Sequence, residues 1–155
     1  MVMTMPLGAL QRVMMDTDVD TTLMLAADMA GVTKDVATRI VEAGLPMMAN
    51  VADEDPWVFK AMYAQSVKPL PEPVYSTKLA KTPKARQALA NEFRAVYGAM
   101  TETLNRDAAS QANATEHQAS QVLAATMPAV VKALGKENTR KNEMGFGRQL
   151  RNLSV

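Results

Sequence analysis

Two stretches of the chain share one pattern: AADMAGVTKDVATRIVEAGLP at residues 26–46 and AASQANATEHQASQVLAATMP at residues 108–128. They align without a gap at an offset of 82 positions. The pairs with the most demanding local geometry are Gly31 with Asn113, Thr33 with Thr115, and Pro46 with Pro128. Glycine and asparagine tolerate a left-handed helix end, threonine caps a helix start, and proline suits a first helical turn. The sequence therefore predicts a duplicated helical unit rather than a chance match of alanine-rich segments.

The fold class predicted from the composition is all-α. Alternating β-branched runs are scarce, whereas Ala, Leu, Met and Gln are abundant. Each copy of the unit is expected to be three short helices with helix-turn-helix or homeodomain-like packing. The caps, glycines and prolines predict helices over 7–15, 20–30, 33–43, 46–52, 55–65, 83–112, 115–125 and 128–135.

The predicted organisation has four parts. An N-terminal helical unit covers residues 1–67, and a connector with four prolines covers residues 68–83. Residues 84–135 hold a long helix and the second unit, and residues 136–155 form a basic tail. Two related units joined by a connector and a long helix are thus expected.

The pattern Ala26-Ala27-x-x-Ala30-Gly31-x-Thr33-x-x-x-Ala37-x-x-x-Val41-x-x-x-Leu45-Pro46, with its echo at 108–128, resembles the YidB-like bacterial domain of unknown function. The resemblance covers residues 20–65 and 100–150, while the proline-rich middle departs from the glycine-rich stretches usual in that family. It implies an all-helical fold with a repeated unit and a bacterial origin. The motif is structural, so the resemblance implies no activity and no site residues.

The residue types present argue against catalysis. The 155 residues include no cysteine, which excludes a disulfide scaffold, a zinc–thiolate site, an iron–sulfur cluster and a cysteine nucleophile. His117 is the only histidine and is expected on the surface. The run Asp16–Asp20 starts like a calcium loop, but Thr21 and Ala27 stand where glycine and glutamate are required. We therefore expect no enzyme activity, no cofactor, no metal and no small-molecule substrate.

The cellular setting is predicted to be the cytoplasm. Residues 1–10 lack the basic start of a signal peptide. No stretch approaches the roughly 18 apolar residues of a membrane helix, so no membrane association is expected.

Charge and methionine are unevenly distributed. Residues 1–56 contain three basic and nine acidic residues, whereas residues 57–155 contain 14 basic and seven acidic ones. The two halves either neutralise each other within one molecule, or promote head-to-tail association, or let the basic half bind an acidic partner. Nine of the 13 methionines precede residue 49, and they either fill the core or line a groove for a partner helix.

These features predict a non-catalytic interaction or assembly protein that binds a protein partner or forms oligomers. Six of the seven aromatic residues lie between Trp57 and Tyr97, and they form either a cluster between the units or a dimer contact. The alternative is a nucleic-acid-binding protein that uses the basic C-terminal half, with phosphate contacts that include Lys132. The candidate partner-binding residues are Trp57, Phe59, Tyr63, Lys136, Arg140, Lys141, Phe146, Arg148 and Arg151.

Overall fold

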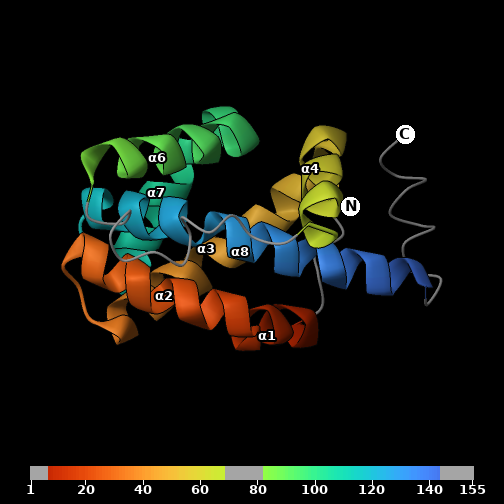
Figure 1. Cartoon of the computed structure of the whole chain (residues 1–155), viewed down its shortest axis with the longest axis horizontal. Coiled ribbons are helices and arrows are strands. Elements are labelled where there is room, and N and C mark those ends of the chain that lie inside the picture. The colour runs from red at the N-terminus through yellow and green to blue at the C-terminus, as the bar shows by residue number, and fades with distance from the viewer. Residues whose placement is uncertain (1–6, 69–81, 144–155) are drawn as a thin grey trace.

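The structure is a computed structural model that describes residues 7–68 and 82–143 (Figure 1). These residues contain helices and no strand, so the predicted all-α class is confirmed. The elements are α1 (Leu7–Met15), α2 (Thr17–Ala30), α3 (Lys34–Glu54), α4 (Pro56–Ser66), α6 (Pro83–Tyr97), the 3₁₀ turn η2 (Gly98–Met100), α7 (Thr101–Ala112) and α8 (Glu116–Glu143).

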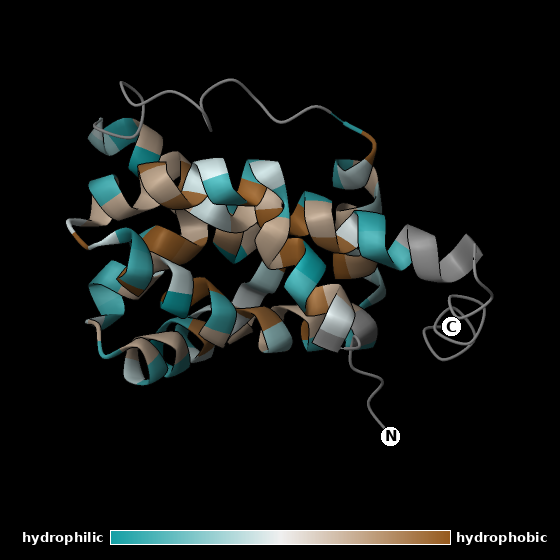
Figure 2. Cartoon of the chain, turned by 90° about the horizontal axis from the view of Figure 1, so that it is seen from below, coloured by the Kyte–Doolittle hydropathy of each residue, from teal (hydrophilic) through white to brown (hydrophobic). Residues whose placement is uncertain are grey.

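Helix α8 is the centre of the fold. All the other α-helices of the described residues pack against it, most extensively α2 and α4. Its side chains Leu123, Val130 and Leu134 are fully buried in a core to which every α-helix contributes. Figure 2 shows hydrophobic and hydrophilic residues alternating around the helices, as expected for helices that bury one face.

Two helical hairpins, α2–α3 and α7–α8, turn in the same way. Gly31 and Asn113 both adopt the left-handed conformation, with φ of 70° and 55°. The Gly31 amide donates to the carbonyls of Ala27 and Asp28, and the Asn113 amide donates to those of Ala109 and Ser110. The acceptors Ala27 and Asp28 of the first turn lie 82 positions before Ala109 and Ser110 of the second. This is the offset that aligns the two sequence stretches.

The helix after each turn also starts in the same way. The Thr33 hydroxyl accepts a hydrogen bond of 3.2 Å from the Val36 amide. The Thr115 hydroxyl accepts one of 3.1 Å from the Gln118 amide. Helix α2 packs chiefly on α8, and α3 on α7. The first helix of each hairpin thus packs against the second helix of the other hairpin.

The predicted helix starts at Pro46 and Pro128 are wrong. Pro46 lies inside α3 and Pro128 inside α8, so each helix after a turn is continuous. Nor do Gly44 and Gly135 end their helices. At both glycines a neighbour approaches closely, because a Cβ on Gly44 would lie 3.1 Å from the Leu123 side chain and one on Gly135 would meet α4. Tertiary packing outweighs the free-energy cost of placing proline and glycine inside a helix. Each unit therefore has one helix fewer than expected.

The predicted long helix over 83–112 is also wrong. It breaks at Gly98, whose φ of 53° and ψ of −127° suit glycine alone, and the chain resumes as η2 and α7. The predicted start of α2 at Asp20 is displaced, because Asp16 caps the helix by accepting from the amides of Asp18 and Val19. Residues 136–143, which were expected to belong to the basic tail, are the last turns of α8. Residues 69–81 of the connector and 144–155 of the tail lie outside the described residues.

Candidate protein-binding surface

Helix α4 is anchored by one side only. The Asp55 carboxylate accepts a hydrogen bond of 2.9 Å from the Trp57 amide, and Pro56 occupies the first turn. Val58 and Met62 are fully buried where α4 packs on α8. Residues three and four apart share a helix face, so burial of these two side chains leaves the opposite side of α4 at the surface.

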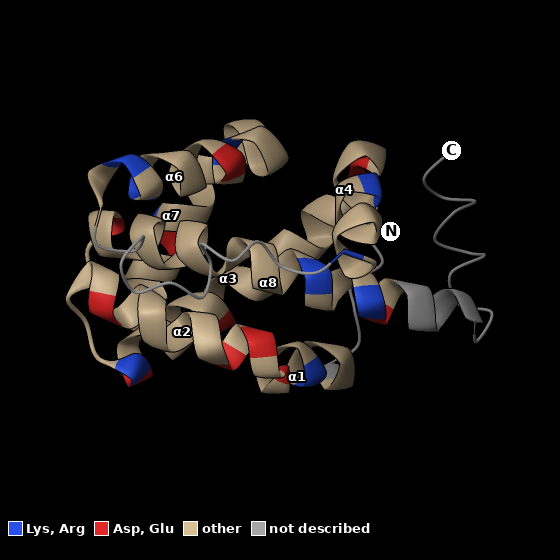
Figure 3. Ribbon diagram, in the orientation of Figure 1, with Lys and Arg blue, Asp and Glu red and all other residues tan. Residues whose placement is uncertain are grey.

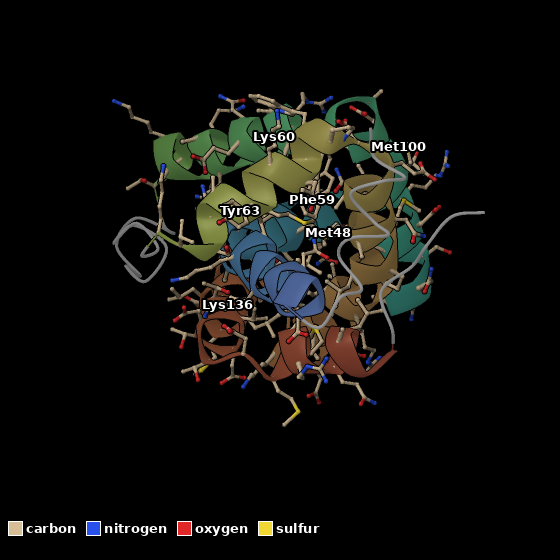
Figure 4. All side chains as sticks on the ribbon, turned by 90° about the vertical axis from the view of Figure 1, so that its right-hand side faces the viewer. Met48, Phe59, Lys60, Tyr63, Met100 and Lys136 are labelled. Carbon is tan, nitrogen blue, oxygen red and sulfur yellow. The ribbon has the colours of Figure 1, made fainter. Side chains whose placement is uncertain are left out.

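The exposed side of α4 carries large apolar side chains. Trp57 is 68% exposed, Tyr63 52% and Val67 70%. Lys60 lies on the same exposed side, and Figure 4 labels it with Tyr63 at the end of the molecule where α4 crosses α8. We call Trp57, Lys60, Tyr63 and Val67 the α4 face.

The α4 face combines aromatic, aliphatic and basic side chains. Single exposed apolar residues are ordinary on a protein, but here Trp57 and Tyr63 lie on one helix and Val67 follows at its C-cap. Tryptophan and tyrosine are the residues most enriched among those that dominate binding energy. Each buries roughly 150–250 Å² when it is covered. A covered α4 face would therefore contribute much of a partner's binding energy.

The nine predicted binding residues do not all lie on one surface of the described structure. Trp57 and Tyr63 lie on the α4 face, while Phe59 is only partly exposed. Lys136 is exposed on α8 at the same end of the molecule (Figure 4). Arg140 and Lys141 belong to α8, but their side chains are not described. Three candidates lie outside the described residues: Phe146, Arg148 and Arg151.

A second apolar surface lies between α1 and α3. It is a groove of 650 Å³, which we call the α1–α3 groove, lined by Leu10, Gln11, Met14, Met15, Glu42, Leu45 and Pro46. Met15 is 81% exposed, whereas Met48 is buried in the core. Some N-terminal methionines thus fill the core and others line a groove, and a partner helix for this groove stays a prediction.

Several residues of these two surfaces were not predicted. Lys60 and Val67 follow Trp57 by three and ten residues, so a helical projection of 56–67 with Val58 and Met62 inward would have found them. No local pattern marks Leu10, Glu42 or Pro46 as neighbours, because α1 and α3 meet only in the tertiary structure.

The oppositely charged halves neutralise each other in part. Asp18 on α2 lies 3.9 Å from Lys132 on α8, and Asp16 lies 3.7 Å from Lys136. Figure 3 shows the acidic start of α2 beneath these basic residues of α8. Lys132, a candidate for phosphate contacts, and Lys136 therefore face carboxylates, which argues against a free basic stripe at these two positions.

His117 is exposed, as the sequence predicts. It lines a groove of 470 Å³ between α6 and α8, to which Gln87 and Ser120 also contribute. The Ser120 hydroxyl donates a hydrogen bond of 2.7 Å to the His117 carbonyl, which is a local helix contact. Residues 7–68 and 82–143 hold no group of three or more acidic, histidine or cysteine side chains that would bind a metal ion. No helix within these two ranges has the length and apolar character to span a bilayer.

Comparisons with protein-family models, with curated proteins and with solved structures find no match to this chain. The resemblance to the YidB-like domain therefore stays a prediction, and function has to be argued from the surfaces alone.

Proposed function

We propose that the chain is a non-catalytic interaction protein that binds a protein partner through the α4 face. The observation that carries the proposal is the exposure of Trp57 and Tyr63, with Val67 at the C-cap, on a helix whose opposite side is held in the core. A helix fixed in this way presents its aromatic side chains without having to fold on binding. Such pre-organisation reduces the entropy cost of association.

The tight contact between α4 and α8 supports this rigidity. Gly135 of α8 lies so close to the backbone of α4 that a Cβ there would overlap the Met62 carbonyl oxygen and lie 2.8 Å from the Met62 carbonyl carbon. The Asn138 amide, which is buried, lies 3.7 Å from the sulfur of Met62. Both contacts hold the last turns of α4 while leaving the α4 face uncovered.

Photo-crosslinking in cells tests the proposal. A benzophenone amino acid is placed at Tyr63 and, in a control, at Met24, which is 58% exposed on α2. We expect a protein crosslinked from position 63 and not from position 24. That protein is then purified, and its affinity for the chain and for each variant is measured by isothermal titration calorimetry, which needs no fluorescent residue.

The affinity of variants decides the outcome. Truncation of an interface anchor costs 2 kcal/mol or more, so Trp57→Ala should weaken binding by about 30-fold, and Met24→Ala should leave it unchanged. Identical crosslinks from both positions, or full affinity of Trp57→Ala, would overturn the proposal.

A further inference from the structure

We infer that the partner of the α4 face is a second copy of this chain, whose α1–α3 groove receives Trp57 in a head-to-tail contact. This inference rests on the proposed function and adds the identity of the occupant. Two observations carry it: the chain exposes two different apolar surfaces, and these carry opposite charges at Lys60 and Glu42.

The two surfaces match in shape and chemistry. The α4 face presents Trp57 and Tyr63 on one side of a helix and Val67 at its C-cap, and an apolar helix side is the form that docks into a groove between two helices. The α1–α3 groove has such helical walls, and its 650 Å³ is within the range of pockets that enclose a ligand. Its flexible methionines, Met14 and Met15, adapt to a large ring.

A chain does not fill its own groove with its own α4. Helices α1 and α4 lie on opposite sides of α8 in two perpendicular views (Figures 1 and 4). Trp57 and Met15 accordingly remain 68% and 81% exposed within one molecule. No helix within residues 7–68 and 82–143 therefore fills the groove, which leaves it for the α4 of another molecule.

Charge gives the contact its direction. Glu42 lines the groove and Lys60 lies on the α4 face, and both are exposed. Among the described residues neither has an ion-pair partner within 4.0 Å. Docking of the α4 face in the groove would bring the ammonium and the carboxylate together at the rim, and this pairing favours the heterologous contact over the meeting of two like surfaces.

The contact joins unlike surfaces, so each copy keeps one surface free after pairing. Such heterologous contacts extend into open chains or close into rings. A dimer that pairs one surface with itself would stop at two copies. Growth beyond two copies therefore distinguishes the head-to-tail contact from a symmetric dimer.

Sedimentation of the full chain and its variants at low salt tests the inference. Trp57→Ala disables the α4 face, and Met15→Lys places a cation in the groove at a side chain so exposed that folding is not affected. Met24→Lys is the matched control, because Met24 is exposed and belongs to neither surface. We expect the natural chain and Met24→Lys to grow beyond dimers with concentration, and Trp57→Ala and Met15→Lys each to stay monomeric.

Mixing the two disabled variants is the decisive step. Trp57→Ala keeps its groove and Met15→Lys keeps its α4 face, so an equimolar mixture should form dimers that grow no further. Separately, Lys60→Glu and Glu42→Lys should each weaken association by about tenfold, and the double variant should recover most of it.

The other outcomes overturn the inference in distinguishable ways. A chain that stays monomeric at all concentrations while position 63 still crosslinks a different protein removes self-association and leaves the proposed function standing. Monomers without any crosslink remove both. Self-association that persists in Trp57→Ala and Met15→Lys, or the absence of dimers in their mixture, excludes the head-to-tail contact.

Discussion

Arg12 and Glu137 join the two ends of the described chain. The guanidinium of Arg12 on α1 donates hydrogen bonds of 3.0, 3.1 and 3.0 Å to the carboxylate of Glu137 on α8, which lies 125 residues away in the sequence. The Glu137 side chain is only 12% exposed. Hydrogen bonding to this carboxylate raises the pKa of Arg12. The pair holds one wall of the α1–α3 groove against the central helix.

Removal of Arg12 should therefore destabilise the protein more than removal of an ordinary surface cation. Arg12→Met leaves the Glu137 carboxylate in a mostly buried place without its partner. The matched control is Arg106→Met, because Arg106 makes only an exposed contact of 3.6 Å with Asp107. Urea unfolding of both variants is the measurement.

A double-mutant cycle isolates the Arg12–Glu137 interaction. We expect Arg12→Met to cost less stability in a Glu137→Leu background than in the natural chain, because no unpaired carboxylate is then left. Equal losses in the two backgrounds would contradict a coupling between these residues.

Gly135→Ala should destabilise the protein by about 1–3 kcal/mol, the usual cost of overpacking. A methyl group at this position would overlap the carbonyl of Met62, and backbone does not move aside as a flexible side chain does. Gly8→Ala is the control, because Gly8 lies in α1 and a Cβ there would meet only the Arg12 side chain at 3.6 Å. Thermal unfolding should show a lower midpoint for Gly135→Ala alone, and equal midpoints would refute the close crossing of α4 and α8.

The two turns should respond alike to substitution. Gly31→Ala and Asn113→Ala each place alanine in the left-handed conformation, which costs roughly 1–2 kcal/mol. Gly31→Asn and Asn113→Gly exchange the two tolerated residue types and should cost much less. Chemical denaturation of the four variants checks this, and a large loss in the exchange variants would show that the turns are not equivalent.

Tyr97→Phe should stabilise the protein by about 1 kcal/mol at neutral pH. The Tyr97 side chain is buried beside Phe93, with 4.9 Å between the ring centroids, and its hydroxyl has no hydrogen-bond partner among the described residues. Removal of the hydroxyl ends the cost of burying an unsatisfied polar group. Tyr63→Phe, with its hydroxyl on the exposed α4 face, is the control and should change stability little.

Tyr97 also predicts a loss of folding stability at alkaline pH. Burial raises the pKa of Tyr97, whereas tyrosine in an unfolded chain titrates near a pH of about 10. The stability contributed by the neutral phenol is complete below that pH and is lost as the pH rises above it, because the unfolded chain then releases the proton. Urea unfolding between neutral and strongly alkaline pH should show a smaller loss for Tyr97→Phe, and identical losses would contradict the burial of Tyr97.

The amino-acid sequence by itself determined the features that depend on neighbouring residues. The all-α class, the helix over 7–15, the Asp55–Pro56 start of α4 and the two turns at Gly31 and Asn113 are set by propensity and capping within a few residues. Trp57 and Tyr63 were likewise proposed for binding from the sequence alone.

Only the tertiary structure decided what depends on residues far apart. Pro46 and Pro128 continue their helices, since packing against α7 and α4 outweighs a local preference to end. The α1–α3 groove and the Arg12–Glu137 pair arise because α1, α3 and α8 meet in space. Burial and ion pairing act over distances of a few ångströms, and no periodicity within one helix records which other helix lies that close.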